Sequence, residues 1–401
     1  MKTYLAPVGP SAGSARGFTR STLVSLVVFA AITPLLLLVA PAVAAQLGGP
    51  MGLSASQIGT YFFVELGAFS LATVPSYLWL GRVDARRVAG CATAVFCVGN
   101  LITALVMPGF VALLALRAVT ALGGGTLMVL CMTSAATSGD RDRVYGLWVV
   151  GQLVAGALGL LLLPHLFNAF GLRALYVTLA LLALCAAPLT LGFDPALGGK
   201  PHQRDPHNEH NEPTARATAG NSSCTANAAF AVAGVLAFYL AIGGVWTFAS
   251  EAASLAGLDA SRSGSVLAIA SVMGIAGAGT ASLIGGRFAR RAMLMAGYGL
   301  LFAALAGLSV NSGVEAYMTA IFAFKFAWTF VLPFILAAAA NKDRSGRLIA
   351  SLNFVIGAGL AIGPLIAGVL LDAGAGLHTL FAGAAAICTL SLICLLRVER
   401  S

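Results

Sequence analysis

The sequence predicts an all-α membrane protein with twelve transmembrane helices, arranged as two parallel-repeat six-helix bundles. Three observations support this fold class. Only 9% of the 401 residues are charged and 59% are hydrophobic, with a mean hydropathy of +0.92, whereas a soluble domain carries about 25% charged residues. Apolar runs of about 20 residues recur along the chain, the length at which a helix crosses a hydrocarbon core roughly 30 Å thick. The two halves of the chain also repeat each other.

The apolar runs define twelve spans, and each is expected to be a helix because a helix satisfies its own backbone hydrogen bonds in lipid. The expected spans are residues 22–45, 54–81, 88–107, 110–136, 144–166 and 173–193 in the first half, and 228–250, 264–285, 292–310, 315–340, 348–371 and 377–396 in the second. The first run follows basic residues and ends in Ala42-Val43-Ala44, as a cleaved signal peptide does. We expect no cleavage, because the run is too long and its loss would break the repeat.

A polar segment separates the two halves. The chain is therefore expected to consist of an N-terminal bundle over residues 1–193, a cytoplasmic linker over residues 194–227 and a C-terminal bundle over residues 228–401. A metal site at His202, His207 and His210 is the alternative to a solvated linker, and the polar composition of the segment favours the linker. The seven cysteines lack metal-ligand spacing, so we expect neither a metal nor a cofactor.

The distribution of basic residues predicts the orientation in the membrane. Nineteen of the 23 Lys and Arg residues fall in segments on the same side as the N-terminus, and the positive-inside rule makes that side cytoplasmic. We therefore expect a multi-pass protein of the cytoplasmic (inner) membrane with both termini in the cytoplasm. The net charge of +9 does not indicate nucleic acid, because the basic residues are dispersed among short loops rather than gathered on one face.

The repeat is visible at a nearly constant offset. Residues 55–59 (ASQIG) match residues 260–264 (ASRSG) at an offset of 205, and Arg117 in the fourth span matches Lys325 in the tenth at an offset of 208. Each half has six spans, an even number, so the halves run in the same direction across the membrane. Such parallel repeats place the substrate site between the halves near the bilayer midplane.

Short motifs give the chain a family resemblance. They are Gly81-Arg82-Val83-Asp84-Ala85-Arg86-Arg87 after the second span, Arg117 followed by Gly123-Gly124-Gly125 in the fourth, and Gly171-Leu172-Arg173 before the sixth. With these motifs the chain resembles the major facilitator superfamily over nearly its whole length. The resemblance implies transport by rocking of the two bundles, a cavity lined by spans 1, 4, 7 and 10, and a latch between the halves in the outward-open state formed by Asp84, Arg86 and Arg87.

Three charged residues lie inside the expected spans, namely Glu65, Arg117 and Lys325, and such residues are functional candidates because charge is costly in a bilayer. In the implied fold Arg117 and Lys325 face each other across the cavity. Two cations repel unless an anion lies between them, which predicts an organic anion or aromatic carboxylate as substrate. The alternatives are that Arg117 pairs with Glu65 and only holds helices together, and that Lys325 reaches the outer interface.

Proton coupling needs an ionisable group whose protonation changes with its surroundings. Glu65 is the preferred candidate, and Glu251, at the outer end of the seventh span, is the rival, for which a solvated loop residue is the simpler interpretation. Further substrate-binding candidates are polar and aromatic residues of spans 5, 7, 10 and 11: Gln152, Tyr239, Trp246, Phe322, Trp328 and Asn353. The aromatic residues also suit helix packing, and the two amides suit bridging between helices.

These observations predict a monomeric secondary active transporter of a small organic solute, coupled to protons. A drug or toxic-metabolite exporter is the first alternative, disfavoured because Ala157 replaces the proline of the fifth-span signature and the Gly-Pro pair stands at Gly363-Pro364 instead. A non-transporting membrane sensor or scaffold is the second. An enzyme is disfavoured, because the sequence has no nucleophile elbow, phosphate loop or zinc motif.

Overall fold

The computed structural model describes residues 18–138, 141–197, 222–285, 287–310, 313–340 and 347–400. In these ranges the regular structure is helical and contains no strand. Eleven helices of the described residues are long and apolar enough to cross a membrane, and three short helices occupy the place of the first span. The predicted fold class, a helical membrane protein built from two bundles, is therefore confirmed. The proposed linker falls largely outside the described residues.

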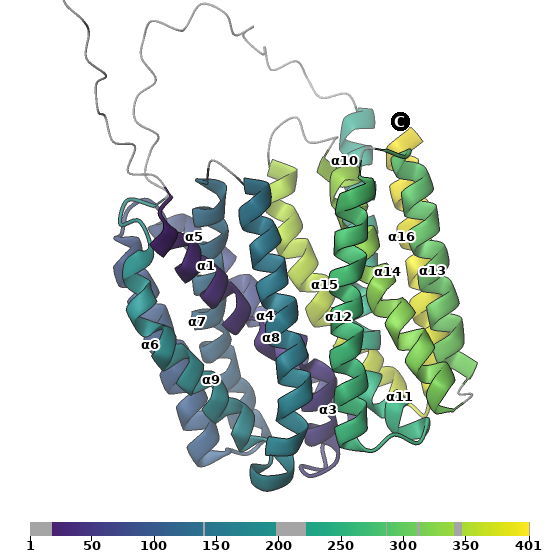
Figure 1. Ribbon diagram of the computed structural model, residues 1–401, viewed down its shortest axis with the longest axis horizontal. Coiled ribbons are helices and arrows are strands. Elements are labelled where there is room, and N and C mark those ends of the chain that lie inside the picture. The colour runs from purple at the N-terminus through teal and green to yellow at the C-terminus, as the bar shows by residue number, and fades with distance from the viewer. Residues whose placement is uncertain are drawn as a thin grey trace, which may run out of the picture.

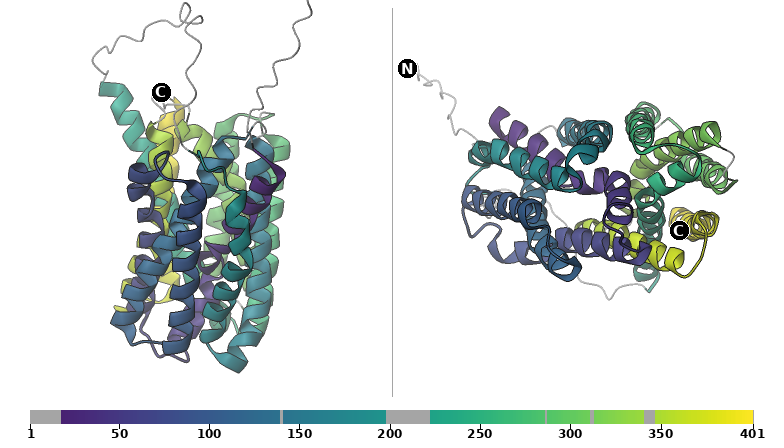
Figure 2. Two further views of the ribbon diagram at one scale, coloured as in Figure 1. Left: turned by 90° about the vertical axis from the view of Figure 1, so that its left-hand side faces the viewer. Right: turned by 90° about the horizontal axis from the view of Figure 1, so that it is seen from below.

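The first half of the chain occupies one side of the molecule and the second half the other (Figures 1 and 2). The helices of the first half are α1 (Arg20–Ile32), α2 (Leu35–Leu38), α3 (Ala40–Gly48), α4 (Ala55–Leu71), α5 (Thr73–Trp79), α6 (Ala85–Val106), α7 (Phe110–Ala136), α8 (Arg141–Phe170) and α9 (Arg173–Ala186) with the 3-10 helix η1 (Ala187–Gly192). Those of the second half are α10 (Ser222–Thr247), α11 (Ala249–Leu255), α12 (Ala260–Ile284), α13 (Arg290–Val310), α14 (Val314–Ala340), α15 (Arg347–Asp372) and α16 (Leu377–Arg400).

Two faces of the molecule are used below as reference points. The chain-end face carries the start of α1 and the end of α16, at the top of Figure 1, and the α11 face, at the bottom, carries α3 and α11. The positive-inside rule predicts that the chain-end face is cytoplasmic.

The first span is not the continuous helix that its hydropathy predicts. It breaks after α1 and again between α2 and α3. Pro34 lies at the first break, and Pro41 lies in the first turn of α3, just after the second break. Proline lacks the amide hydrogen that a helix interior requires. Each break therefore lies beside a residue that cannot continue the helical hydrogen bonding. The seventh span also breaks, between α10 and α11 at Phe248, close to the α11 face.

The repeat seen in the sequence also appears in the helix starts. Ser54 caps α4 and accepts a hydrogen bond from the backbone N–H of Gln57, while Asp259, its equivalent at an offset of 205, caps α12 and accepts one from Arg262. Such caps satisfy backbone donors that a helix start leaves unpaired. Both helices begin at the α11 face, and both pack against the opposite half.

Two helix pairs join the halves: α4 packs against α15, and α8 packs against α12. A repeat-equivalent glycine stands in each pair, close to the α11 face. A Cβ added at Gly59 would collide with the Pro364 carbonyl, and one added at Gly264 would collide with Pro164 and the Leu160 carbonyl. Small residues let membrane helices approach closely, so these glycines permit the two halves to close at this face.

Replacing Gly264 by alanine should therefore destabilise the packed halves. The new methyl group meets backbone and ring atoms that cannot move aside, and overpacking of this kind costs about 1–3 kcal/mol. We expect a lower Tm for the purified Gly264→Ala protein. Gly279→Ala is the matched control on the same helix, because nothing lies within 4 Å of an added Cβ there. Equal melting temperatures for the two variants would contradict the close contact.

Candidate functional site

A cavity of about 350 Å³ lies between the two halves. It is lined by α2, α4, α5, α7 and α8 of the first half and by α10, α14 and α15 of the second. Residues that line it include Phe69, Trp148, Gln152, Tyr239, Trp246, Lys325, Trp328, Thr329 and Leu360. Most of its surface is apolar or aromatic, and Lys325 is the only charged residue among those that line it in the described part of the chain.

The cavity lies toward the chain-end face. Its lining residues on α4 and the turn after it run from Leu66 to Thr73, at the end of that helix, and those on α7 run from Gly125 to Met132. On α8, which starts at the chain-end face, they run from Trp148 to Leu153. All three sets therefore occupy the half of the molecule nearest the chain ends.

Contacts between the halves close the molecule at the opposite face. The Asp372 carboxylate, at the end of α15, accepts hydrogen bonds from the backbone N–H groups of Ala55 at 2.9 Å and Ser56 at 3.0 Å. These groups start α4, where unpaired donors and the helix dipole favour an anion. One turn earlier on α15, Gly368 lies against the Ala55 backbone. The structure is thus closed at the α11 face, with its cavity toward the other.

The Lys325 ammonium group lies between two indole rings. Its Nζ is 3.7 Å from the ring centroid of Trp246 and 3.9 Å from that of Trp328. The residue is only 3% exposed, and no ion pair to it is found among the described residues. A cation over an indole face gains about 0.5–2 kcal/mol, so the two rings replace part of the hydration that burial removes.

Helical spacing explains how this arrangement forms. Lys325, Trp328 and Thr329 stand at positions i, i+3 and i+4 of α14 and share one face. The Thr329 hydroxyl donates a 2.7 Å hydrogen bond to the Gly274 carbonyl, which fixes α14 against α12. Trp246 comes from α10, and its Nε1 donates to the Leu37 carbonyl of the first half at 3.3 Å. The aromatic cage that Trp246 and Trp328 form around the Lys325 ammonium therefore bridges the two halves.

Arg117 is placed differently from the expected position across the cavity. It is fully buried, and its guanidinium donates to both Glu65 oxygens at 2.8 and 2.7 Å and to the Asn100 side-chain oxygen at 2.8 Å. The Tyr176 ring lies 5.1 Å from its Cζ. Neither Arg117 nor Glu65 lines the cavity. The alternative geometry, an ion pair within the first half, is the one observed, because α4 and α6 supply an acid and an amide on that side.

The latch candidates make contacts within their own half. Asp84 caps α6 and accepts from the Arg86 backbone N–H at 2.8 Å, and the Arg86 Nε donates to the Phe193 carbonyl at 2.9 Å. Arg87 is exposed. The resemblance assigns the latch to the outward-open state, whereas the cavity of this structure lies toward the chain-end face, which the basic residues predict to be cytoplasmic. The latch role of these residues stays a prediction.

The other predicted site residues differ in whether they line the cavity. Gln152 and Tyr239 line the cavity together with the two tryptophans, and the Gln152 amide donates to the Ala30 carbonyl at 3.1 Å. Phe322 is half-buried and does not line the cavity. Glu251 is exposed and lines a separate hollow at the α11 face. Asn353 lies in α15, but its side chain is outside the description, as are His202, His207 and His210.

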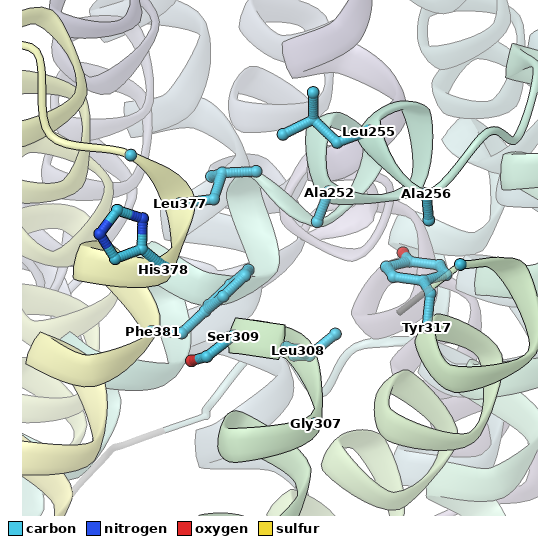
Figure 3. Close-up of a pocket in the computed structure, with 12 residues that line it drawn as sticks. Ala252, Leu255, Ala256, Gly307, Leu308, Ser309, Tyr317, Leu377, His378 and Phe381 are labelled. Carbon is cyan, nitrogen blue, oxygen red and sulfur yellow. The ribbon is translucent and has the colours of Figure 1, made fainter. Parts of the chain in front are cut away.

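A second cavity, of about 330 Å³, opens within the second half at the α11 face. Tyr317 of α14 and His378 and Phe381 of α16 lie around it in Figure 3. Its hydroxyl groups are already engaged: Tyr317 donates to the Ala249 carbonyl at 2.8 Å and Ser309 to the Leu305 carbonyl at 2.9 Å. This cavity contacts only one half, so rocking of the halves would not expose it to alternate sides.

Sequence reasoning missed Asp372 and the sealing role of Gly59 and Gly264. The glycines were detectable as conserved positions of the internal repeat, since both belong to the matching five-residue segments. Asp372 has no such signal, because its partners lie 316 and 317 residues away. Its hydrogen bonds depend entirely on how the halves meet.

Comparisons with known proteins agree with this architecture. The family model described as Major Facilitator Superfamily matches residues 21–342. Among solved structures, a bacterial homolog to the human lysosomal transporter Spinster, described as inward-facing and unoccupied, has a TM-score of 0.65 at 14% identity, with 94% of this chain and 96% of that chain covered. The nucleoside transporter NupG has a TM-score of 0.67 at 11% identity, with 96% and 100% covered. No curated protein matches the sequence significantly.

The Glu65–Arg117 pair generates a stability prediction. Glu65→Gln leaves a fully buried guanidinium without its counter-ion, and breaking a buried pair in this way costs about 3–5 kcal/mol. We expect a large fall in Tm for this variant. In the double variant Glu65→Leu/Arg117→Met both charges are gone, and most of the stability should return. A double variant as unstable as the single one would show that the pair contributes through something other than its charges.

Proposed function

Because the chain belongs to the Major Facilitator Superfamily, a family of membrane transporters, we propose that it carries an amphipathic organic anion by alternating access. The single observation behind this proposal is the Lys325 ammonium in the cavity between the halves, without an acidic partner among the described residues. A carboxylate or sulfonate bound there would supply the missing counter-ion and form charge-assisted hydrogen bonds.

The remaining lining supports a substrate with an aromatic or apolar body. Trp148, Phe69 and Leu360 line the cavity beside the Lys325 cage. Binding sites of this type gain affinity from apolar contact and orientation from a few polar groups. Gln152 and Tyr239 supply such polar groups, and a volume of about 350 Å³ suits a molecule with one or two rings.

Alternating access is supported by the one-sided closure. With the chain-end face in the cytoplasm, as the basic residues predict, the cavity is on the inner side and the Asp372 contacts form the outer closure. Rocking would release these contacts and bring Asp84, Arg86 and Arg87 toward the second half. We place the protein in the inner membrane, as a monomer, with protons as the coupling ion.

A drug or toxic-metabolite exporter is the second candidate, and the largely apolar lining favours it. The two functions differ in what they require of Lys325. An exporter of neutral lipophilic compounds would tolerate its loss, whereas binding of an anion would not.

Replacement of Lys325 tests the proposed substrate class. Lys325→Gln removes the charge and should weaken the binding of aromatic carboxylates about 10- to 100-fold, the effect of losing a charged hydrogen bond of about 1.5–3 kcal/mol. Quenching of tryptophan fluorescence measures the Kd, since three indoles line the cavity. Phe326→Leu, on the same helix but outside the cavity lining, is the control. Unchanged affinity in Lys325→Gln would favour the exporter of neutral compounds.

Loss of the Asp372 contacts should open the outer face. Asp372→Asn removes the charge from the α4 N-terminus, and we expect a severalfold faster reaction of an introduced Ser263→Cys with a membrane-impermeant maleimide, in a background without the native cysteines. Ser263 is a suitable reporter because it is 3% exposed and adjoins Gly264 at the closed face. Glu315→Gln is the control, because it removes an acidic residue from the first turn of α14, within the second half. Equal labelling in both variants would exclude Asp372 from the closure.

A further inference from the structure

We propose that Lys325 itself carries the coupled proton, so that each proton crosses together with the anion bound to the same ammonium group. This inference rests on the proposed function, because it requires an anionic substrate in the cavity between the halves. It assigns to one side chain the two roles that the sequence distributes between Lys325 and Glu65.

Glu65 is poorly placed to exchange a proton. Both of its oxygens accept hydrogen bonds from Arg117, and the remaining Arg117 nitrogen donates to Asn100. Protonation of Glu65 would leave a fully buried guanidinium charge unbalanced, which is among the most costly changes in a protein interior. The pair also lies outside the lining of the cavity, so substrate does not touch it.

The surroundings of Lys325 contain neither an acid nor a second cation among the described residues. Trp328 and Thr329 face it from α14, Trp246 and Tyr239 line the same cavity from α10, and Gly274 of α12 adjoins the lysine stem. From the first half, α8 contributes Gln152 and Leu153; from the second half, α15 contributes Leu360. Tyr239 is the only other titratable group in this set, and its neutral phenol leaves the ammonium without a counter-ion.

Charge on Lys325 and occupancy of the site therefore favour each other. In the empty cavity the ammonium has two indole faces beside it and no ion-pair partner among the described residues, whereas a bound anion would neutralise it. By linkage, a proton on Nζ raises the affinity for the anion, and the anion raises the affinity for the proton by the same factor. A carrier with this property favours the doubly loaded and the empty states over the singly loaded ones, which is the requirement for coupled movement.

The proton balance of the cycle is simple. On the side of uptake the Nζ lone pair of the neutral amine forms an N–H bond with a proton from water, and the anion binds to the ammonium. After the halves rock, the anion leaves, the N–H bond breaks, its electron pair returns to Nζ and the proton passes to water. One proton and one negative charge cross together, so the step is electrically neutral.

The Lys325→Arg variant separates this mechanism from simple anion binding. Arginine keeps the positive charge but does not deprotonate in proteins. The test uses the full-length protein in proteoliposomes with naphthalene-2-sulfonate, an aromatic anion that remains ionised, so that a co-transported proton must be carried by the protein. Exchange of labelled for unlabelled sulfonate is compared with net uptake driven by a pH gradient, and an internal pH dye records proton movement.

We expect the unmodified protein to exchange the sulfonate and to accumulate it with about one proton per anion. In Lys325→Arg the ratio of net uptake and proton movement to exchange should fall at least about tenfold, whatever the change in its affinity for the sulfonate. The double variant Glu65→Leu/Arg117→Met should keep both activities and the proton stoichiometry. Net proton-coupled uptake by Lys325→Arg, or loss of coupling only in the double variant, would overturn the proposal.

Two further outcomes are informative. If the unmodified protein neither binds nor exchanges the sulfonate or an aromatic carboxylate, the proposed substrate class fails, independently of the coupling residue. If Lys325→Arg does not bind the sulfonate, the protons taken up when the sulfonate binds are measured on the unmodified protein. Binding in weakly buffered solution should then take up protons at some pH between about 6 and 10, and no uptake throughout that range would overturn the assignment to Lys325.

Discussion

The cost of an ionised side chain in the membrane interior governs the design of both halves. On insertion scales each such charge costs about 2.5–3.5 kcal/mol, and the protein meets this cost in two ways. Glu65 and Arg117 neutralise each other, with Asn100 completing the guanidinium bonds. Lys325 lies between two indole faces and has no ion-pair partner among the described residues. A fully compensated pair is suited to holding helices, whereas an incompletely compensated charge is suited to binding something else.

The internal repeat makes this contrast sharper, because Arg117 and Lys325 occupy matching positions in α7 and α14. The repeat places a cation at the matching position of each half, but the two cations have different neighbours. In the first half, α4 and α6 turn an acid and an amide toward the guanidinium. In the second, Gly274 of α12 adjoins the lysine stem, and no acid among the described residues pairs with Lys325. The symmetry of the fold therefore does not extend to the chemistry of its charged residues.

Hydropathy and charge predicted the spans well, since each depends on residues close together in sequence. The fourth span, for example, was expected over residues 110–136 and α7 covers Phe110–Ala136. The direction in which Arg117 points could not be predicted in this way. It depends on the rotation of α7 about its axis relative to Glu65 and Asn100, which lie 52 and 17 residues away. The cavity placement of Lys325 and Trp328 was predictable, because they share a helix face.

Trp246 connects the proposed chemistry to the movement of the halves. Its ring covers the Lys325 ammonium at 3.7 Å, and its indole N–H donates to the Leu37 carbonyl at 3.3 Å, across the boundary between the halves. The electrostatic part of the first contact exists only while the lysine is charged. A change in the charge of Lys325 therefore alters how firmly the cage holds a residue that also bonds to the opposite half. In the proposed cycle, protonation of Lys325 and rocking of the halves would both act on Trp246, which would give coupling a direct physical route.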